Sequence, residues 1–89
     1  MISREIEIVN KLGLHARAAA KFVTEAGRYS CSVQLARDDQ KVNGKSIMGV
    51  MMLAASKGTV LQIQTEGEGE EEAMQALVAL IDDKFGEGE

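Results

Sequence analysis

A chain of 89 residues has room for one domain, which we place at residues 1–89, with a single sheet-and-helix core and no deep interior cleft. Its net charge of −4 and its scarcity of aromatic residues argue against a nucleic-acid partner, because nucleic acids select basic patches and stacking rings. A single cysteine excludes an internal disulfide, and neither a signal peptide nor a membrane-spanning run is evident, so we expect a cytoplasmic monomer.

Hydrophobic periodicity predicts the elements of the first half of the chain. Apolar and polar residues alternate over residues 2–8, which indicates a half-buried strand. From Ala16 to a stop at Gly27 the apolar residues follow the 3.6-residue period of a helix. Alternation returns over Ser32–Arg37 and, after a short acidic turn, over residues 40–42, which predicts a β-hairpin.

The next segment predicts a second helix and a fourth strand. Ser46 stands where a helix N-cap belongs, and the apolar residues from 47 to 54 have helical spacing, with Gly58 as the stop. Alternation over residues 59–65 then indicates a strand.

The chain closes with a third predicted helix. A glycine-interrupted acidic run should form a solvated loop and the first helical turn, the helix should end near Phe85, and residues 86–89 should fray. The resulting order, β-α-β-β-α-β-α, indicates an α+β fold in which three amphipathic helices cover one face of a four-stranded antiparallel sheet. A split-βαβ, ferredoxin-like sheet with an extra C-terminal helix fits the same order.

His15 is the only histidine of the chain, and it stands where a turn meets the start of the first helix. A lone histidine is more often a cap or turn residue than a reactive group. We expect no metal and no cofactor, since no recognisable ligand spacing accompanies it, and no nucleophile–base pair suggests a hydrolytic triad. Phosphoryl acceptance remains, because a helix N-terminus helps to keep imidazole neutral and stabilises an anionic product.

Two further residues have chemistry that suits a phosphate. Arg17 could simply face solvent in the first turn, but its guanidinium can also neutralise phosphoryl oxygens. Ser46 is first of all an N-cap, and an N-cap serine can be phosphorylated because the phosphate meets the positive end of the helix dipole. The methionines that follow exceed what one buried face needs, so Met48 and Met52 should be exposed as an adaptable partner surface.

Two blocks of the sequence resemble those of one family. Residues 13–19 (GLHARAA) and 43–53 (NGKSIMGVMML) closely resemble the two sequence blocks of HPr, the histidine-containing phosphocarrier of the bacterial phosphotransferase system. Length, element order and the separation of the blocks agree with this family over essentially the whole chain. The resemblance implies an open-faced β-sandwich, and so favours the first of the two topologies.

The resemblance also implies a phosphocarrier rather than a turnover enzyme. His15 would accept a phosphoryl group on Nδ1 from phosphorylated enzyme I and pass it to a histidine of an EIIA-type protein, with Arg17 as the charge partner of the phosphate. Ser46 would match the regulatory serine that an ATP-dependent HPr kinase modifies in some lineages. The family's docking surface would fall on Ala16, Arg17, Ala20, Lys21, Thr24, Ile47, Met48, Met51 and Met52.

The branch of the family is suggested by one departure from its commonest pattern and by one run of residues. Ala18 stands where many members have proline, and with the run 51–55 (MMLAA) it looks more like the nitrogen-related branch, NPr. That branch would use a nitrogen-type enzyme I and EIIA for a regulatory output. The alternatives are a sugar-transport HPr, a binding module controlled by phosphorylation of Ser46, and an acylphosphatase-type hydrolase, for which Arg17 lacks an evident asparagine partner.

Overall fold

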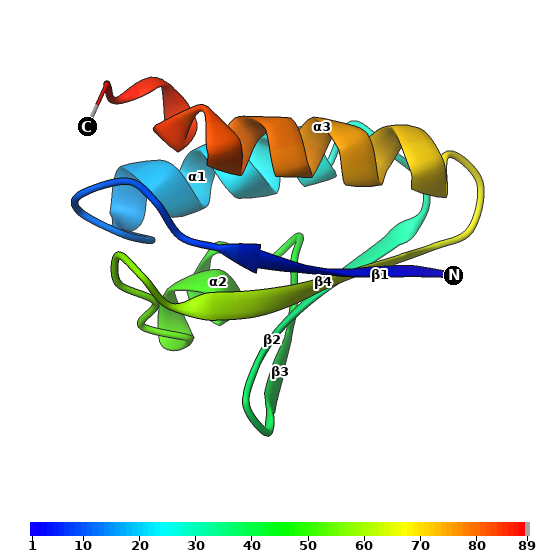
Figure 1. The fold of residues 1–89 in the computed structure, drawn as a ribbon. Helices are drawn as coiled ribbons and strands as arrows, with labels where there is room; N and C mark the ends of the chain where they lie inside the picture. Colours follow the sequence, from blue (N-terminus) through cyan, green and yellow to red (C-terminus); the bar gives the residue numbers. More distant parts are fainter. Residues whose placement is uncertain (89) are drawn as a thin grey trace.

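The computed structural model describes residues 1–88, which form one antiparallel sheet with helices packed against it (Figure 1). The sheet has the strand order β1-β4-β2-β3. Its strands are β1 (Ile2–Glu7), β2 (Ser32–Arg37), β3 (Gln40–Asn43) and β4 (Val60–Glu66), and the helices are α1 (Ala16–Ala26), α2 (Ile47–Met52) and α3 (Glu70–Asp82). Figure 1 shows α1 and α3 side by side over one face of the sheet, and α2 packs against α1 and β3.

Strand pairing decides between the two topologies that the element order allowed. β4 lies between β1 and β2, and β3 pairs with the outer side of β2; all three pairings are antiparallel. A split-βαβ, ferredoxin-like sheet would place β3 between β1 and β2 and β4 at the edge, whereas here β4 lies between β1 and β2 and β3 is at the edge. The open-faced antiparallel sheet with three helices is therefore confirmed, and the ferredoxin-like alternative is wrong.

The core lies between the sheet and the layer formed by α1 and α3. Its side chains come from the apolar positions that the sequence pattern predicts for the strands and helices. Inward-facing side chains of β2 and β4, together with the apolar stripes of α1 and α3, are almost fully buried. These are Val33, Leu35, Leu61, Ile63, Ala19, Phe22, Ala26, Ala73, Leu77 and Ile81. The apolar periodicity of the sequence therefore identified the face that each of these elements buries.

The second helix is shorter than its sequence predicts, because α2 ends at Met52 rather than continuing through Ala54 toward Gly58. Ala54 has φ +50 and is exposed, whereas Leu53 and Ala55 on either side of it are buried. Nη1 of Arg37 donates to the carbonyl oxygens of Leu53 at 2.9 Å and Ala54 at 3.1 Å, which satisfies carbonyl groups at the helix end. Burying Leu53 and Ala55 together requires the chain to leave the helical path between them.

The third helix also ends early, and Phe85 lies outside it. A short turn, η1 (Lys84–Gly86), follows α3, with φ +56 at Lys84, +54 at Phe85 and +74 at Gly86. Left-handed backbone costs a non-glycine residue about 1–2 kcal/mol. The Phe85 side chain is 1% exposed, and burying a phenylalanine stabilises by about 1.5–3 kcal/mol, which offsets much of that cost. Burial of one aromatic ring thus favours a turn where helical periodicity predicted a helix.

No helix within residues 1–88 is long and apolar enough to cross a membrane.

Candidate functional site

The turn that leads into α1 requires glycine at position 13. Gly13 has φ +68, a left-handed conformation that glycine adopts without steric cost. A Cβ at this position would lie 2.5 Å from the carbonyl oxygen of Ala55, which accepts a hydrogen bond from the backbone N–H of Leu14 at 2.9 Å. The close approach that Gly13 permits is therefore to the chain's own backbone beyond α2, and it ties the start of α1 to that segment.

His15 is the N-cap residue of α1, and its imidazole leaves the helix N-terminus open. Its backbone is extended (φ −71, ψ 176), its carbonyl accepts from the N–H of Ala19 at 2.8 Å, and its side chain makes no capping hydrogen bond. Helix geometry leaves the N–H groups of the first turn without partners inside the helix. Because that turn holds no acidic residue, the positive end of the dipole is available to an anion beside the imidazole.

An open pocket of about 670 Å³ adjoins the half-buried imidazole. Three basic side chains line it, from Lys11, Arg17 and Lys21, with the single carboxylate of Glu87 among the described lining residues. The guanidinium of Arg17 has no hydrogen-bond or ion-pair partner within residues 1–88. The pocket is thus locally basic although the whole chain carries a charge of −4.

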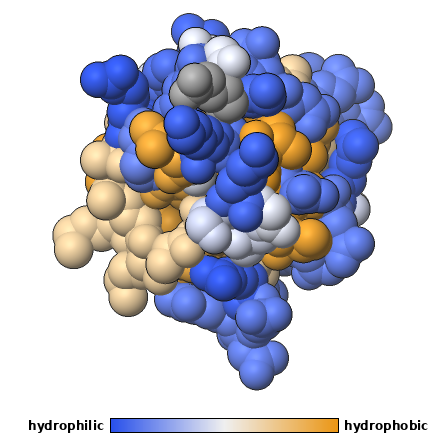
Figure 2. Space-filling model, turned by 60° about the vertical axis from the view of Figure 1, so that its left-hand side comes forward, coloured by the Kyte–Doolittle hydropathy of each residue, from blue (hydrophilic) through white to orange (hydrophobic). Residues whose placement is uncertain are grey.

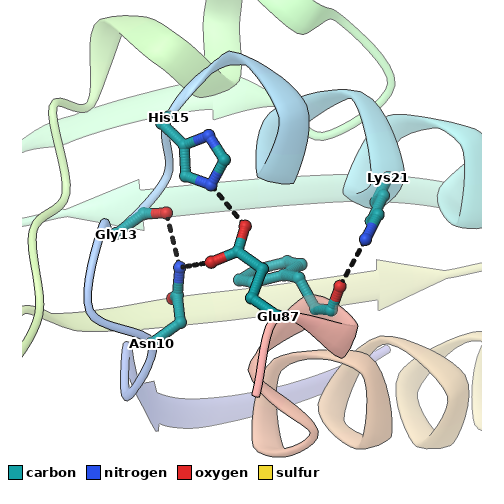
Figure 3. Close-up of polar contacts among 6 residues, drawn as sticks. Asn10, Gly13, His15, Lys21 and Glu87 are labelled. Atoms are coloured by element: carbon teal, nitrogen blue, oxygen red, sulfur yellow. Dashed lines mark hydrogen bonds and ion pairs between the residues drawn. The ribbon is translucent and has the colours of Figure 1, made fainter. Parts of the chain in front are cut away.

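A buried asparagine and a carboxylate from the chain's end meet at the histidine (Figure 3). Asn10 is fully buried, and its Nδ2 donates to the carbonyl oxygen of Gly13 at 2.8 Å and to Oε1 of Glu87 at 3.0 Å. The other carboxylate oxygen, Oε2, contacts Nε2 of His15. Both partners of the Asn10 amide are acceptors, so the network itself determines that the amide nitrogen faces them.

Glu87 reaches this position because the turn η1 returns the chain toward α1. Nζ of Lys21 donates to the carbonyl oxygen of Phe85 at 2.6 Å, and the N–H of Glu87 donates to the carbonyl of Lys84 at 2.9 Å. For Glu87 the structure therefore differs from the expected frayed tail: its side chain is 15% exposed and bonded at both oxygens. Residue 89 lies outside the described residues.

The pKa of the Glu87 carboxyl lies below its ordinary value. Burial by itself would raise this pKa, but the hydrogen bonds from His15 and Asn10, and then the charges of His15 and Lys21, together outweigh that effect. An ionised carboxylate accepts hydrogen bonds and donates none. The hydrogen atom between Glu87 and His15 therefore belongs to Nε2 of the imidazole.

Ser46 caps α2 as predicted, and exposed apolar side chains follow it. Oγ of Ser46 accepts from the backbone N–H of Gly49 at 3.1 Å. Met48 and Met52 are 74% and 65% exposed, which confirms the expected excess of apolar surface on this helix. Figure 2 shows apolar side chains gathered as a projecting patch on one side of the molecule. α1 and α2 are in contact, so their exposed residues lie on neighbouring parts of the molecule.

The docking residues expected from the resemblance are accessible on these two helices. Those on α1 and α2 are exposed apart from Ala20, which is half-buried. They are Ala16, Arg17, Lys21 and Thr24 on α1, and Ile47, Met48, Met51 and Met52 on α2.

Two members of the site were not foreseen from the sequence. Asn10 belongs to no motif of the sequence, and Glu87 falls in the segment 86–89 that is expected to fray. The sequence does not show that Asn10 is buried, because its burial depends on the hydrogen bonds of its amide to Gly13 and to the distant Glu87. The sequence holds only a weak signal for Glu87. It is an acidic residue two positions after Phe85, an aromatic residue that the core can bury.

Comparisons with family models, with related sequences and with solved structures all point to the same family. The family model described as "PTS HPr component phosphorylation site" matches residues 2–83. The chain is 63% identical to the phosphocarrier protein HPr of Pseudomonas aeruginosa and 56% identical to that of Neisseria meningitidis, over the full length of each chain. HPr-C-His from Thermoanaerobacter tengcongensis superimposes with a TM-score of 0.95 at 53% identity, covering 98% of both chains.

Proposed function

The chain belongs to the HPr family, the phosphocarrier proteins of the phosphotransferase system, and on this premise we propose that His15 is its phosphoryl carrier. A phosphocarrier is phosphorylated and dephosphorylated by its partners and is not a turnover enzyme, which removes the hydrolase alternative. His15 takes the phosphoryl group on Nδ1 from phosphorylated enzyme I and passes it to a histidine of an EIIA-type protein. A cytoplasmic site of action is part of the proposal, and it suits a chain whose single cysteine, Cys31, is free and buried.

One observation carries the proposal: the only histidine of the chain stands at an uncapped helix N-terminus beside a basic pocket. An attached phosphoryl group would meet the free N–H groups of the first turn of α1. The unpartnered guanidinium of Arg17 is available for charge-assisted bonds to its oxygens. The open pocket leaves the imidazole accessible to two partner proteins in turn.

Phosphorylation by labelled phosphoenolpyruvate and enzyme I tests the role of His15. The wild-type chain should acquire an acid-labile, base-stable label, and His15→Ala should acquire none. Arg17→Ala should fold and still accept label, but more slowly, because the transferred group loses its charge partner. Uptake of label by His15→Ala would overturn the assignment.

The docking surface proposed for both partners is the exposed face of α1 and α2. Exposed methionines adapt to different partner shapes, which suits a carrier that binds a donor and an acceptor in succession. Basic Arg17 and Lys21 border the same face and can attract acidic partner surfaces. Met48→Ala should therefore keep the fold but raise two KM values: that for phosphorylation of this chain by enzyme I, and that for transfer from this chain to EIIA.

Within the family, the nitrogen-related branch is our proposal for the pathway. It rests on Ala18 in place of the commoner proline and on the run 51–55, and its output would be regulatory rather than sugar uptake. Transfer rates from the phosphorylated chain to a nitrogen-type EIIA and a sugar-type EIIA, measured side by side, distinguish the branches. Faster transfer to the sugar-type protein would assign the chain to sugar transport.

Ser46 is a second proposed phosphorylation site, regulatory rather than catalytic. It is half-buried at the N-cap of α2, next to the exposed methionines, so a phosphate added by an HPr kinase would change the charge of the docking surface. If Ser46→Asp and Ser46→Ala bind every partner like the wild type, this role is excluded.

A further inference from the structure

The tail beyond α3 contributes the one acidic side chain among the described residues that line the histidine pocket. Its position is determined by three separate contacts. Phe85 is buried in the core, its carbonyl accepts from Nζ of Lys21, and Oε1 of Glu87 accepts from the buried amide of Asn10. A carboxylate held from so many sides is a fixed part of the site.

Fixing the carboxylate also fixes the imidazole. Asn10 is itself anchored, since the same Nδ2 donates to the carbonyl of Gly13 at 2.8 Å. With Oε1 occupied by Asn10, Oε2 faces Nε2 of His15. Figure 3 shows the second ring nitrogen pointing away from Glu87.

We propose that Glu87 is a positioning residue for phosphoryl transfer: its carboxylate accepts the Nε2 hydrogen of His15 and leaves the Nδ1 lone pair free to attack phosphorus. This inference rests on the proposed role of His15. The partly buried polar chain Gly13–Asn10–Glu87–His15 thereby selects which nitrogen of the ring is the nucleophile.

The transfer step balances with the Nε2 proton retained. The Nδ1 lone pair forms the new bond to phosphorus as the bond between phosphorus and the donor nitrogen breaks, and that electron pair returns to the donor. The ring of His15 then carries phosphorus on Nδ1 and hydrogen on Nε2, and so holds a positive charge. The carboxylate of Glu87 lies against the nitrogen that shares this charge and stabilises it.

Glu87→Gln gives the sharpest test, because the side chain keeps its shape but has only one acceptor oxygen. Asn10 and the Nε2–H of His15 both need an acceptor. When the glutamine oxygen satisfies Asn10, its NH₂ group faces Nε2 and favours the opposite tautomer, with hydrogen on Nδ1. Glu87→Ala removes the contact without this inversion, and Glu68→Gln, at an exposed position in the loop between β4 and α3, is the matched control.

Three measurements follow for each variant. At saturating phosphorylated enzyme I, Glu87→Gln should take up phosphoryl groups roughly 10- to 100-fold more slowly with little change in KM, the size expected when a reacting group is misplaced. Ring ¹⁵N NMR should show a pyrrole-like Nε2 in the wild type and a larger share of protonated Nδ1 in Glu87→Gln. Phosphoramidate, a small phosphoryl donor, should modify the wild type on Nδ1 and Glu87→Ala increasingly on Nε2.

The outcomes separate this inference from the function on which it rests. Wild-type rates, ¹⁵N shifts and attachment sites in both Glu87 variants, with no label on His15→Ala, would overturn the role of Glu87 alone. Faster uptake by Glu87→Ala would also overturn it, since the tail would then obstruct the site. Label on His15→Ala would overturn the proposed function itself.

Discussion

Helices α1 and α2 both begin at a residue to which we assign phosphorylation, yet their N-termini are built differently. Ser46 uses its own Oγ to cap the N–H of Gly49, so the start of α2 is stabilised from within the helix. His15 makes no capping bond, and its imidazole contacts Glu87 from the far end of the chain. A capped N-terminus is a stable structural start, whereas an uncapped one with an externally held side chain leaves its N–H groups for a ligand.

The turns that precede the two helices differ in the same way. Each contains an asparagine and a glycine, but Asn10 is fully buried and Asn43 is exposed. Gly13 lies against backbone atoms of Ala55 and Ser56, whereas the nearest obstacle at Gly44 is a methyl group of Val33. The start of α1 is therefore tied to backbone beyond α2, whereas the start of α2 combines a local cap with a contact to β2, since the N–H of Gly44 donates to the carbonyl of Val33 at 2.7 Å.

The largest effect on this comparison should come from Gly13→Ala. The left-handed φ and the 2.5 Å approach of a Cβ to the carbonyl of Ala55 leave backbone no room to adjust, so we expect a loss of about 2–4 kcal/mol in unfolding free energy. Urea unfolding measures it. Gly44→Ala is the counterpart before α2; its Cβ would lie 2.6 Å from a methyl group of buried Val33, but the φ of Gly44 is not left-handed, so the substitution should cost less. If both variants lost the same unfolding free energy, the contact of Gly13 with the backbone of Ala55 would be no more important for stability than the contact of Gly44 with Val33.

Asn10→Ala should have the next largest effect. It removes both hydrogen bonds of a buried amide and leaves the carbonyl of Gly13 unsatisfied, which costs about 1–3 kcal/mol. Asn43→Ala is the matched control, since its Oδ1 accepts only from the exposed N–H of Lys45 and water can replace it. The variant Asn10→Ala should also lose protection of the Glu87 amide from hydrogen exchange. Unchanged exchange there would contradict a linkage between the two residues.

Ser46→Ala should destabilise the protein by about 1 kcal/mol, because the N–H of Gly49 loses its cap. Ser46→Asp should restore most of this stability, since aspartate is an equally good N-cap. His15→Ala breaks no cap and should not show the corresponding loss. Thermal unfolding of the three variants compares the two helix starts directly. An equal loss of stability in His15→Ala and Ser46→Ala would contradict the difference between a capped and an uncapped N-terminus.

The smallest effect is a pH dependence that belongs to the tail. The folded pKa of Glu87 is lowered, so its contribution to stability is fully present above the ordinary carboxyl pKa and is lost as the pH falls through the lower folded value. Glu87→Gln should therefore lose less stability than the wild type between about pH 5 and about pH 2. Chemical unfolding at a series of pH values measures the difference. Parallel losses in both proteins would show that the tail contact contributes no pH-dependent stability.

Glu70→Gln is a useful comparison for that measurement. The pKa of Glu70 is lowered as well, first by the hydrogen bond from the backbone N–H of Gly67 and then by the N-terminal amino group. It lies at the start of α3 and does not line the histidine pocket. Glu70→Gln should therefore also reduce the loss of stability at low pH, but it should not change the ring ¹⁵N signals of His15.

Local patterns in the sequence determined most of the framework. Alternation and helical periodicity located the strands and α1, because burial of one face imposes those periods directly. Ser46 could be recognised as an N-cap because capping is a contact between residues three positions apart. His15 and Arg17 stood out because their chemistry and their place at a helix start are both visible in a short stretch of sequence.

Only the tertiary structure decided the features that depend on distant contacts. α2 stops at Met52 because Leu53 and Ala55 are both buried, and Phe85 turns out of the helical path because the core accommodates its ring. Asn10 and Glu87 are 77 positions apart, and no local pattern predicts that they meet at His15. The sequence by itself singled out the histidine to which we assign phosphorylation and the elements around it, whereas folding, by burying Phe85 and Asn10, placed the Glu87 carboxylate against its imidazole.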